Sequence, residues 1–120
     1  MQRELQRAEI ACRTRRVDTE ADFRRELRDF APDLVLADYS IPGFGGMAAL
    51  EILRHEAPLV PLIVVTGSID EETAAACIKA GAADYVLKTH LVRLAPAVRS
   101  ALEMADVFSQ LRAQAAGPLR

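Results

Sequence analysis

The chain has few cysteines and no long hydrophobic run, and these two shortages exclude several kinds of protein. Cys12 and Cys77 lie far apart without a CxxC motif, and His55 and His90 lack the spacing of metal ligands. A disulfide framework or a zinc site is therefore not expected, and both thiols are predicted to be small core residues in a reducing cytoplasm. No apolar run approaches the roughly 20 residues of a membrane span, and the arginine-rich start contains acids, unlike a signal peptide. We expect a cytoplasmic protein without membrane contact.

A strong excess of charge is also missing, since 15 basic residues are balanced by 17 acidic ones. Nothing in the bulk charge therefore favours a nucleic-acid partner, and no segment resembles a recognition helix. The 120 residues, of which 51% are hydrophobic, are enough for one domain with a single core. We expect this domain to span residues 1–112, with residues 113–120 as a tail or linker.

Three short apolar segments are typical of strands buried on both faces, because they lack polar alternation and end at turn residues or charges. They are Leu34 to Ala37, Leu62 to Val65 and Tyr85 to Leu87. Helical patterns lie between them, which predicts an α/β fold with a parallel sheet and helices on both of its faces. A further edge strand is expected at Ala11 to Val17, where arginines interrupt the pattern.

The first two helices are predicted from caps and apolar spacing. One should begin at Asp18 or Thr19 and end before Pro32. The next should span Gly46 to about Glu56. Its apolar residues, which we expect in the core, are Met47, Leu50 and Leu53.

The last two helices follow the second and third apolar segments. One should open at Ser68 or Asp70 and end at Gly81, which would adopt the left-handed conformation of a helix stop. The other should start at Leu91 and run past the domain body. Its apolar positions, three and four residues apart, are Leu94, Val98, Ala101, Ala105 and Phe108.

Three polar residues end the apolar segments: Asp38, Thr66 and Lys88. Ligands bind at the carboxyl ends of strands in open parallel sheets, so these side chains are candidates for one site. Asp38 can act as a nucleophile that accepts a phosphoryl group, Thr66 can hydrogen-bond a phosphoryl oxygen, and Lys88 can neutralise developing charge. Lys88 would also offset the cost of burying Asp38.

Each of these residues also has a simpler interpretation. Asp38 can cap the following loop, Thr66 can precede a glycine turn, and Lys88 can extend along the surface. Tyr85 can be a half-buried strand aromatic. Two observations favour chemistry: the three residues end successive strands, and Lys88 is one of only two lysines beside thirteen arginines.

The sequence resembles the receiver domain of two-component response regulators over about residues 3 to 105. The motifs are LVLADYSIPGFGG with the acceptor Asp38, PLIVVTG with Thr66, and AADYVLK with Tyr85 and Lys88. The resemblance implies a flavodoxin-like, doubly wound sheet with the strand order 2-1-3-4-5. It also implies a signalling module, not an enzyme, that takes a phosphoryl group from a histidine kinase or phosphotransfer protein. Thr66 and Tyr85 would then move and change the surface presented to a downstream output domain or protein.

The sequence departs from the family at its start. Receivers open with a hydrophobic strand and an acidic pair that binds Mg²⁺ together with the acceptor, and the family's spacing would put both before Met1. We therefore expect the first, central strand to be missing from this chain. A shortened chain, a misassigned start codon and a deliberate deletion all remain open. A further departure is Thr89, where the family usually has proline. We therefore expect a trans or locally altered turn after Lys88 and a rearranged loop beyond it.

The missing strand leads to two hypotheses. Only Asp38 and the backbone carbonyl of Ser40 would remain as Mg²⁺ ligands, so binding of the ion should be weak or absent. The strands at Ala11 to Val17 and Leu34 to Asp38 would lack ladder partners, so we expect another copy of the chain to cover the gap in a homo-oligomer.

Two other functions compete with the phosphoacceptor. One is a pseudo-receiver that is not phosphorylated and acts as a protein-interaction or dimerisation module. The other is a flavodoxin-like or Rossmann enzyme, which the absence of a GxGxxG loop after a strand argues against.

Overall fold

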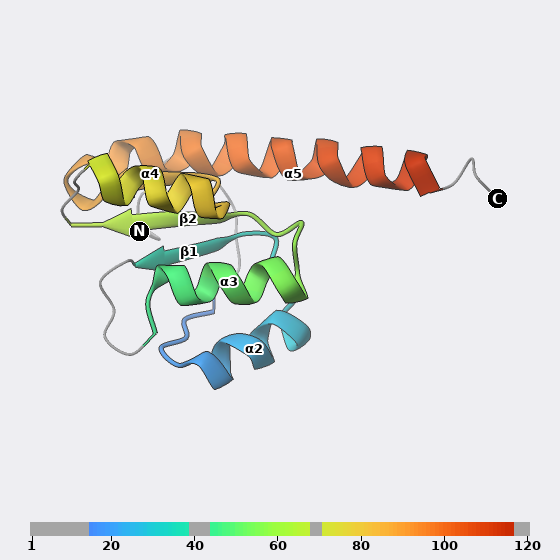
Figure 1. Ribbon diagram of the computed structural model, residues 1–120, viewed down its shortest axis with the longest axis horizontal. Helices are drawn as coiled ribbons and strands as arrows, with labels where there is room; N and C mark the ends of the chain where they lie inside the picture. The colour runs from blue at the N-terminus through green and yellow to red at the C-terminus, as the bar shows by residue number, and fades with distance from the viewer. Residues whose placement is uncertain (1–14, 39–43, 68–70, 117–120) are drawn as a thin grey trace.

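The computed structural model describes residues 15–38, 44–67 and 71–116, and three parallel strands form its centre (Figure 1). The strands are β1 (Val35–Asp38), β2 (Leu62–Thr66) and β3 (Asp84–Leu87), in the spatial order β1-β2-β3. The predicted parallel α/β fold is confirmed. The order matches the last three strands of the expected 2-1-3-4-5 sheet, and no further strand occurs within these described ranges.

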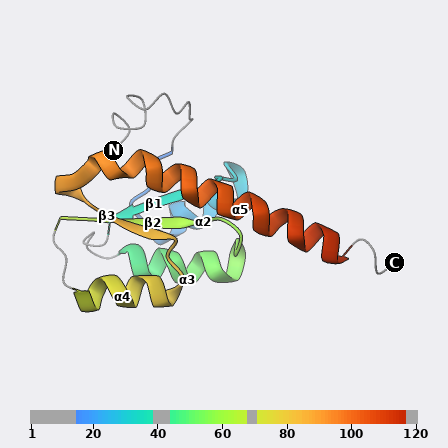
Figure 2. The same cartoon turned by 90° about the horizontal axis from the view of Figure 1, so that it is seen from above.

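Helices cover both faces of the sheet, as predicted. One face carries α2 (Glu20–Asp29), α3 (Gly46–Glu56) and α4 (Glu71–Ala80), and the opposite face carries the long helix α5 (Leu94–Ala116) (Figure 2). A 3₁₀ segment, η1 (Lys88–Arg93), connects β3 to α5. Among the described residues, no helix is long and apolar enough to span a membrane.

The sheet separates two hydrophobic clusters because successive residues of β2 point to opposite faces. Leu62 and Val64 belong to the cluster under α2, α3 and α4, whereas Ile63 and Val65 belong to the cluster under α5. All five residues of β2 are buried, as expected for a strand covered on both faces. By contrast, all four residues of β1 and three of the four residues of β3 are half-buried. Each of these strands is an edge of the described sheet and has one strand neighbour.

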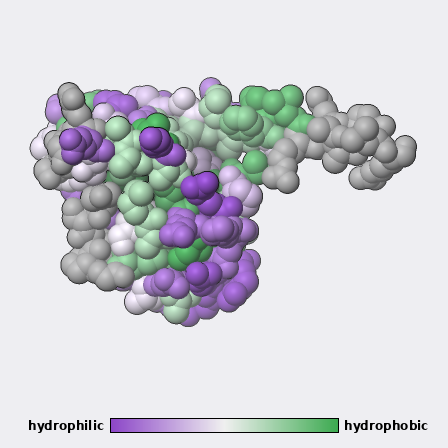
Figure 3. Space-filling model, viewed as in Figure 1, coloured by the Kyte–Doolittle hydropathy of each residue, from purple (hydrophilic) through white to green (hydrophobic). Residues whose placement is uncertain are grey.

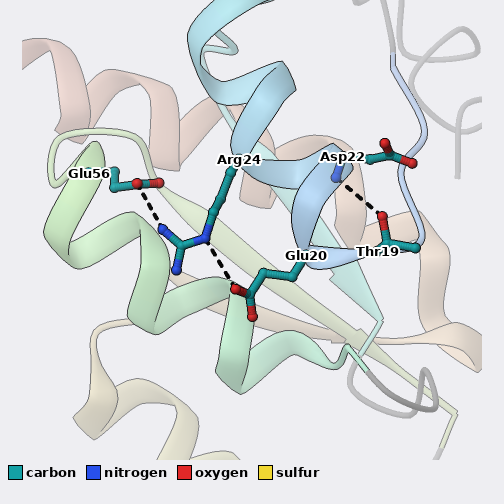
Figure 4. A network of polar contacts seen from close by, with 5 residues as sticks. All are labelled: Thr19, Glu20, Asp22, Arg24 and Glu56. Atoms are coloured by element: carbon teal, nitrogen blue, oxygen red, sulfur yellow. Dashed lines mark hydrogen bonds and ion pairs between the residues drawn. The ribbon is translucent and has the colours of Figure 1, made fainter.

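The helix boundaries follow their local chemistry. Thr19, and not Asp18, caps α2, since its hydroxyl accepts a hydrogen bond from the backbone N–H of Asp22 at 3.2 Å. In the same helix Arg24 joins two elements, because its guanidinium contacts Glu20 at 3.2 Å and Glu56 of α3 at 2.9 Å (Figure 4). The hydrogen bond to Glu20 is the largest of the causes that raise the pKa of Arg24.

Several further expectations are confirmed. The helix α3 spans Gly46–Glu56 as predicted, and Gly81 ends α4 with a φ of +115°. None of the described peptide bonds is cis, so the bond after Lys88 is trans. Cys77 is a buried free thiol, and desolvation raises its pKa, which makes it a poor nucleophile. Cys12 and the expected cap residues Ser68 and Asp70 lie outside the described residues.

The described end of the expected edge strand, residues 15–17, is not a strand. Arg15 lies instead against α2, with its guanidinium 5.3 Å from the ring centroid of Phe30 and 3.8 Å from a carboxylate oxygen of Glu26. Val17 packs beside the α2 and α3 cluster. Side-chain contacts with a helix therefore replace ladder hydrogen bonds here, and residues 11–14 lie outside the described ranges.

Two helix expectations also need correction. Met47 is 37% exposed, because α3 turns Gly46, Ala49, Leu50, Ile52 and Leu53 toward the core and leaves Met47 on its outer side. The last helix begins at Leu94 and not at Leu91, because His90 has a non-helical φ of −129° and ψ of 46° that interrupts the helix. At its other end α5 continues through Ala116, past the expected domain boundary at residue 112.

Candidate functional site

The three polar residues singled out by the sequence end the three neighbouring strands. In the register of the sheet Asp38 lies opposite Val65, one residue before Thr66, and Thr66 lies opposite Leu87, one residue before Lys88. Because the strands are parallel, all three residues lie at the same edge of the sheet. The fold therefore brings the ends of the three strands together at one edge of the sheet, as predicted.

Asp38 and Lys88 form a direct ion pair. The ammonium Nζ of Lys88 donates to Oδ2 of Asp38 at 2.5 Å. The carboxylate side chain is 21% exposed and the lysine side chain 48% exposed, so the pair opens to solvent and can be reached from outside. A pair this exposed contributes little to stability, on the order of 0 to 1 kcal/mol.

Gly67 gives the stem of Lys88 a path across the end of β2. A Cβ built on Gly67 would lie 3.9 Å from Cδ of Lys88, which is ordinary van der Waals contact. The lysine thus passes close to the chain directly after Thr66 on its way to Asp38. Sequence reasoning did not single out Gly67, although the glycine after a strand-end threonine was a visible signal.

Thr66 is the buried member of the group, with 5% of its surface exposed. Every buried side-chain oxygen or nitrogen in the described ranges has a hydrogen-bond partner, so the Thr66 hydroxyl is satisfied in this conformation. A hydroxyl that moves toward a new ligand at the sheet edge must give up that bond. The predicted switch role of Thr66 would require this exchange of hydrogen-bond partners.

Tyr85 lies on β3 next to α4, two residues before the carboxyl end of the strand. It is half-buried and lines a shallow hollow of about 470 Å³ with Ala74, Ala75, Ile78 and Lys79 of α4. The ring therefore has open space beside it, which a change of side-chain rotamer requires. The simpler interpretation, a half-buried strand aromatic, describes its present position equally well.

Arg93, the last residue of η1, contacts β3, and no distinctive signal in the sequence marked it. Its guanidinium donates to the backbone carbonyl of Tyr85 at 3.3 Å and lies 3.4 Å from a carboxylate oxygen of Asp84. The segment that follows Lys88 is thereby held against β3. A displacement of Lys88 would reach the β3 surface through η1.

The described residues do not fit a magnesium site. Magnesium prefers about six oxygen ligands in an octahedron. Within the described ranges no group of three acidic, histidine or cysteine residues could hold a metal ion, and the carboxylate of Asp38 already contacts an ammonium. The expected backbone ligand Ser40 lies outside the described residues. Weak or absent binding of the ion stays a prediction.

Comparison with known proteins agrees with this geometry. The family model of the response regulator receiver domain matches residues 1–99. The chain is 31% identical over 88 residues to the DNA-binding transcriptional regulator NtrC of Escherichia coli, and 34% identical over 85 residues to the regulatory protein AtoC of the same organism. These matches cover 73% and 70% of the chain but only 18% of either regulator.

Solved structures show the same fold. The receiver domain of NtrX from Brucella abortus superimposes with a TM-score of 0.72 at 28% identity, covering 80% of this chain and 82% of that domain. The signal receiver domain of a Luxo repressor protein from Vibrio parahaemolyticus gives a TM-score of 0.78 at 20% identity, covering 92% and 84%. At 20% identity, the similarity to the second structure supports a shared fold and nothing more. On the family match, the strand order and the shared sequence, the chain belongs to the receiver domain family of response regulators.

Proposed function

We propose that this receiver accepts a phosphoryl group on Asp38 from a phosphohistidine of a partner kinase or phosphotransfer protein. The observation that supports this most directly is the contact between Asp38 and Lys88 at the open edge of the sheet, with Thr66 on the strand between them. An exposed carboxylate is a nucleophile, and the adjacent cation can follow the charge when it moves to the phosphoryl oxygens.

In the transfer step an oxygen of Asp38 forms a bond to phosphorus as the P–N bond to the donor histidine breaks. The leaving nitrogen takes the electron pair of the broken bond. Because the other ring nitrogen carries a proton, the donor histidine departs as a neutral imidazole. Asp38 becomes an acyl phosphate, and Lys88 turns from the carboxylate to a phosphoryl oxygen.

The signal is a change of surface. Thr66 moves its hydroxyl toward the phosphoryl group, and Tyr85 turns into the space that this movement opens. The hollow between β3 and α4 then changes shape, and that face meets a downstream output domain or protein. The chain acts in the cytoplasm, where such kinases and outputs meet, and it binds no nucleic acid itself. It functions as a homo-oligomer.

A second candidate function is supported by two observations. The described residues contain no cluster of acidic side chains that could bind a metal ion, and the ammonium of Lys88 can neutralise Asp38 permanently. A pseudo-receiver, which binds partners through its surface without phosphorylation, needs neither a metal site nor a free acceptor carboxylate. The same experiment separates the two functions.

The test is the intact mass of the chain after incubation with acetyl phosphate and magnesium, beside the variant Asp38→Asn. We expect the parent chain to gain one phosphoryl group and the variant to gain none, because the amide is not a nucleophile that can form the acyl phosphate. A mass unchanged in both chains would favour the pseudo-receiver. A gain in both would place the acceptor elsewhere.

Thr66→Ala should separate acceptance from signalling. The acceptor and the lysine remain, so we expect the variant still to be phosphorylated. The movement of Tyr85 should be lost, because no hydroxyl is drawn toward the phosphoryl group. Tyrosine ring signals in NMR spectra, recorded before and after phosphorylation, give the measurement, and Thr73→Ala on α4 provides the matched control. Equal changes in the Tyr85 signals of both variants would remove Thr66 from the switch.

A further inference from the structure

The segment η1 carries Lys88 at the edge of the sheet, but hydrophobic packing does little to fix it. None of its residues is buried, and His90 interrupts its helical backbone. Leu91 is half-buried against the cluster under α5. The exposed hydrophobic side chains of α5 gather on its protruding part, at the end away from η1 (Figure 3). The turn that holds Lys88 therefore depends on polar contacts for a single position.

The elements on either side of η1 are firmly placed. All four residues of β3 pair with β2, and Leu94, the first residue of α5, is 0% exposed. Within η1 the hydroxyl of Thr89 lies 3.3 Å from Nδ1 of His90, but this contact stays inside the segment and cannot anchor it. A contact that ties η1 to β3 would reduce the freedom of the turn most effectively.

Arg93 supplies this contact through two nitrogens of its guanidinium. Nη1 donates to the backbone carbonyl of Tyr85 at 3.3 Å, and Nη2 lies 3.4 Å from Oδ2 of Asp84. The other carboxylate oxygen of Asp84 accepts a hydrogen bond from the backbone N–H of Tyr85 at 2.7 Å, so the carboxylate is itself held against β3. Because a guanidinium is planar and rigid, two neighbouring acceptors restrict its orientation as well as its position.

The two contacts close a ring that contains Lys88. The chain runs from Tyr85 along β3 to Lys88 and through η1 to Arg93, whose side chain returns to the carbonyl of Tyr85. Closing so short a loop removes much of the conformational freedom of its backbone. Lys88 has a flexible side chain that is 48% exposed, so the contact of its ammonium with Asp38 depends on where the backbone starts.

We propose that Arg93 is a positioning residue for phosphoryl transfer, because its contacts with Asp84 and Tyr85 hold the turn that places the ammonium of Lys88 on the acceptor oxygen. Arg93 acts through Lys88, since its guanidinium is bound to β3 and not to Asp38. Small displacements matter because a cation stabilises the transition state best at hydrogen-bond distance. This role rests on the proposed phosphoryl transfer, whereas the placement of Lys88 can be measured without it.

The first measurement is the initial rate of mass gain with acetyl phosphate and magnesium. Arg93→Met keeps a long side chain but removes both donors. We expect it to react about three- to tenfold more slowly, because the lost contacts are exposed to solvent and their loss loosens the turn without unfolding it. The matched control is Arg16→Met, which removes the same charge from a side chain that is 92% exposed and lies before α2. It should react at the parent rate.

A double variant separates positioning from a general effect on the fold. When Lys88→Met is already present, Arg93→Met should slow the reaction no further, because no ammonium is left to be placed. Equal slowing with and without Lys88 would make Arg93 a structural residue and overturn the inference. So would a rate for Arg93→Met equal to that of Arg16→Met.

The second measurement uses the unphosphorylated chain, which has only two lysines. Lysine labelled with ¹³C at Cε therefore gives two sets of NMR signals, and Lys79→Met identifies the set of Lys88. We expect a lower order parameter for Lys88 in Arg93→Met than in Arg16→Met. If no chain gains a phosphoryl group, the proposed transfer fails, and a more mobile Lys88 still supports the positioning by Arg93. An unchanged mobility of Lys88 would overturn it.

Discussion

Replacing Lys88 with methionine is expected to slow the phosphorylation of Asp38 by a factor of about 100 to 1,000, the usual cost of removing one charged or hydrogen-bonding group that stabilises a transition state. Methionine keeps the length of the stem that passes Gly67 but removes the ammonium that lies 2.5 Å from the acceptor oxygen. Charge that develops on the phosphoryl oxygens then meets only solvent. The measurement is the initial rate of mass gain with acetyl phosphate.

The matched control is Lys79→Met, which changes the only other lysine of the chain. Lys79 is exposed on α4 and does not take part in the ion pair with Asp38. This variant should be phosphorylated at the parent rate. Both variants should keep the parent stability to within about 1 kcal/mol, because both lysines are exposed.

The combination of a large rate effect and a small stability effect is what identifies a functional lysine. If Lys88→Met were phosphorylated as fast as Lys79→Met, the ion pair would be structural and the pseudo-receiver would gain support. If Lys88→Met instead unfolded at markedly lower urea concentration, the pair would contribute to folding in spite of its exposure. Either result would contradict the role assigned to Lys88.

The site could be predicted from the sequence because it depends on strand ends. Each apolar segment stops at one of the three polar residues, and the pairing of parallel strands brings the ends of successive strands to one edge of the sheet, whatever the side-chain packing. What the sequence could not predict is the exact register, which places Asp38 opposite Val65 and Thr66 opposite Leu87. The contact between Asp38 and Lys88, fifty residues apart, follows from this topology.

The errors concern features that only tertiary packing decides. Arginines at residues 15 and 16 suited an edge strand, but contacts of Arg15 with Phe30 and Glu26 hold this segment against α2. A break at His90 delays the last helix to Leu94, and no residue type marks it in advance. Which face of α3 is buried likewise depends on the elements that pack against this helix.

The buried face of α3 leads to the last prediction, which compares two apolar residues of this helix. Leu53 is 2% exposed in the cluster beneath α3 and α4, whereas Met47 lies in the first turn and faces outward. Leu53→Ala should lower the free energy of unfolding by about 2 to 5 kcal/mol, because it removes buried methyl groups and leaves a cavity. That is a large part of the roughly 5 to 15 kcal/mol typical of a domain.

Met47→Ala is the matched control, since alanine is equally compatible with the helix at both positions. Its cost should stay below about 1 kcal/mol, because the side chain is already in contact with water. Urea unfolding of both variants, with the slope and midpoint compared, measures the difference. The apolar spacing of α3 alone assigned Met47 to the core together with Leu53. Equal losses of stability would therefore favour that assignment over the exposed position of Met47 in the structure. A loss confined to Leu53→Ala would show that packing against β2 and α4, and not the spacing of apolar residues, determines the buried face of this helix.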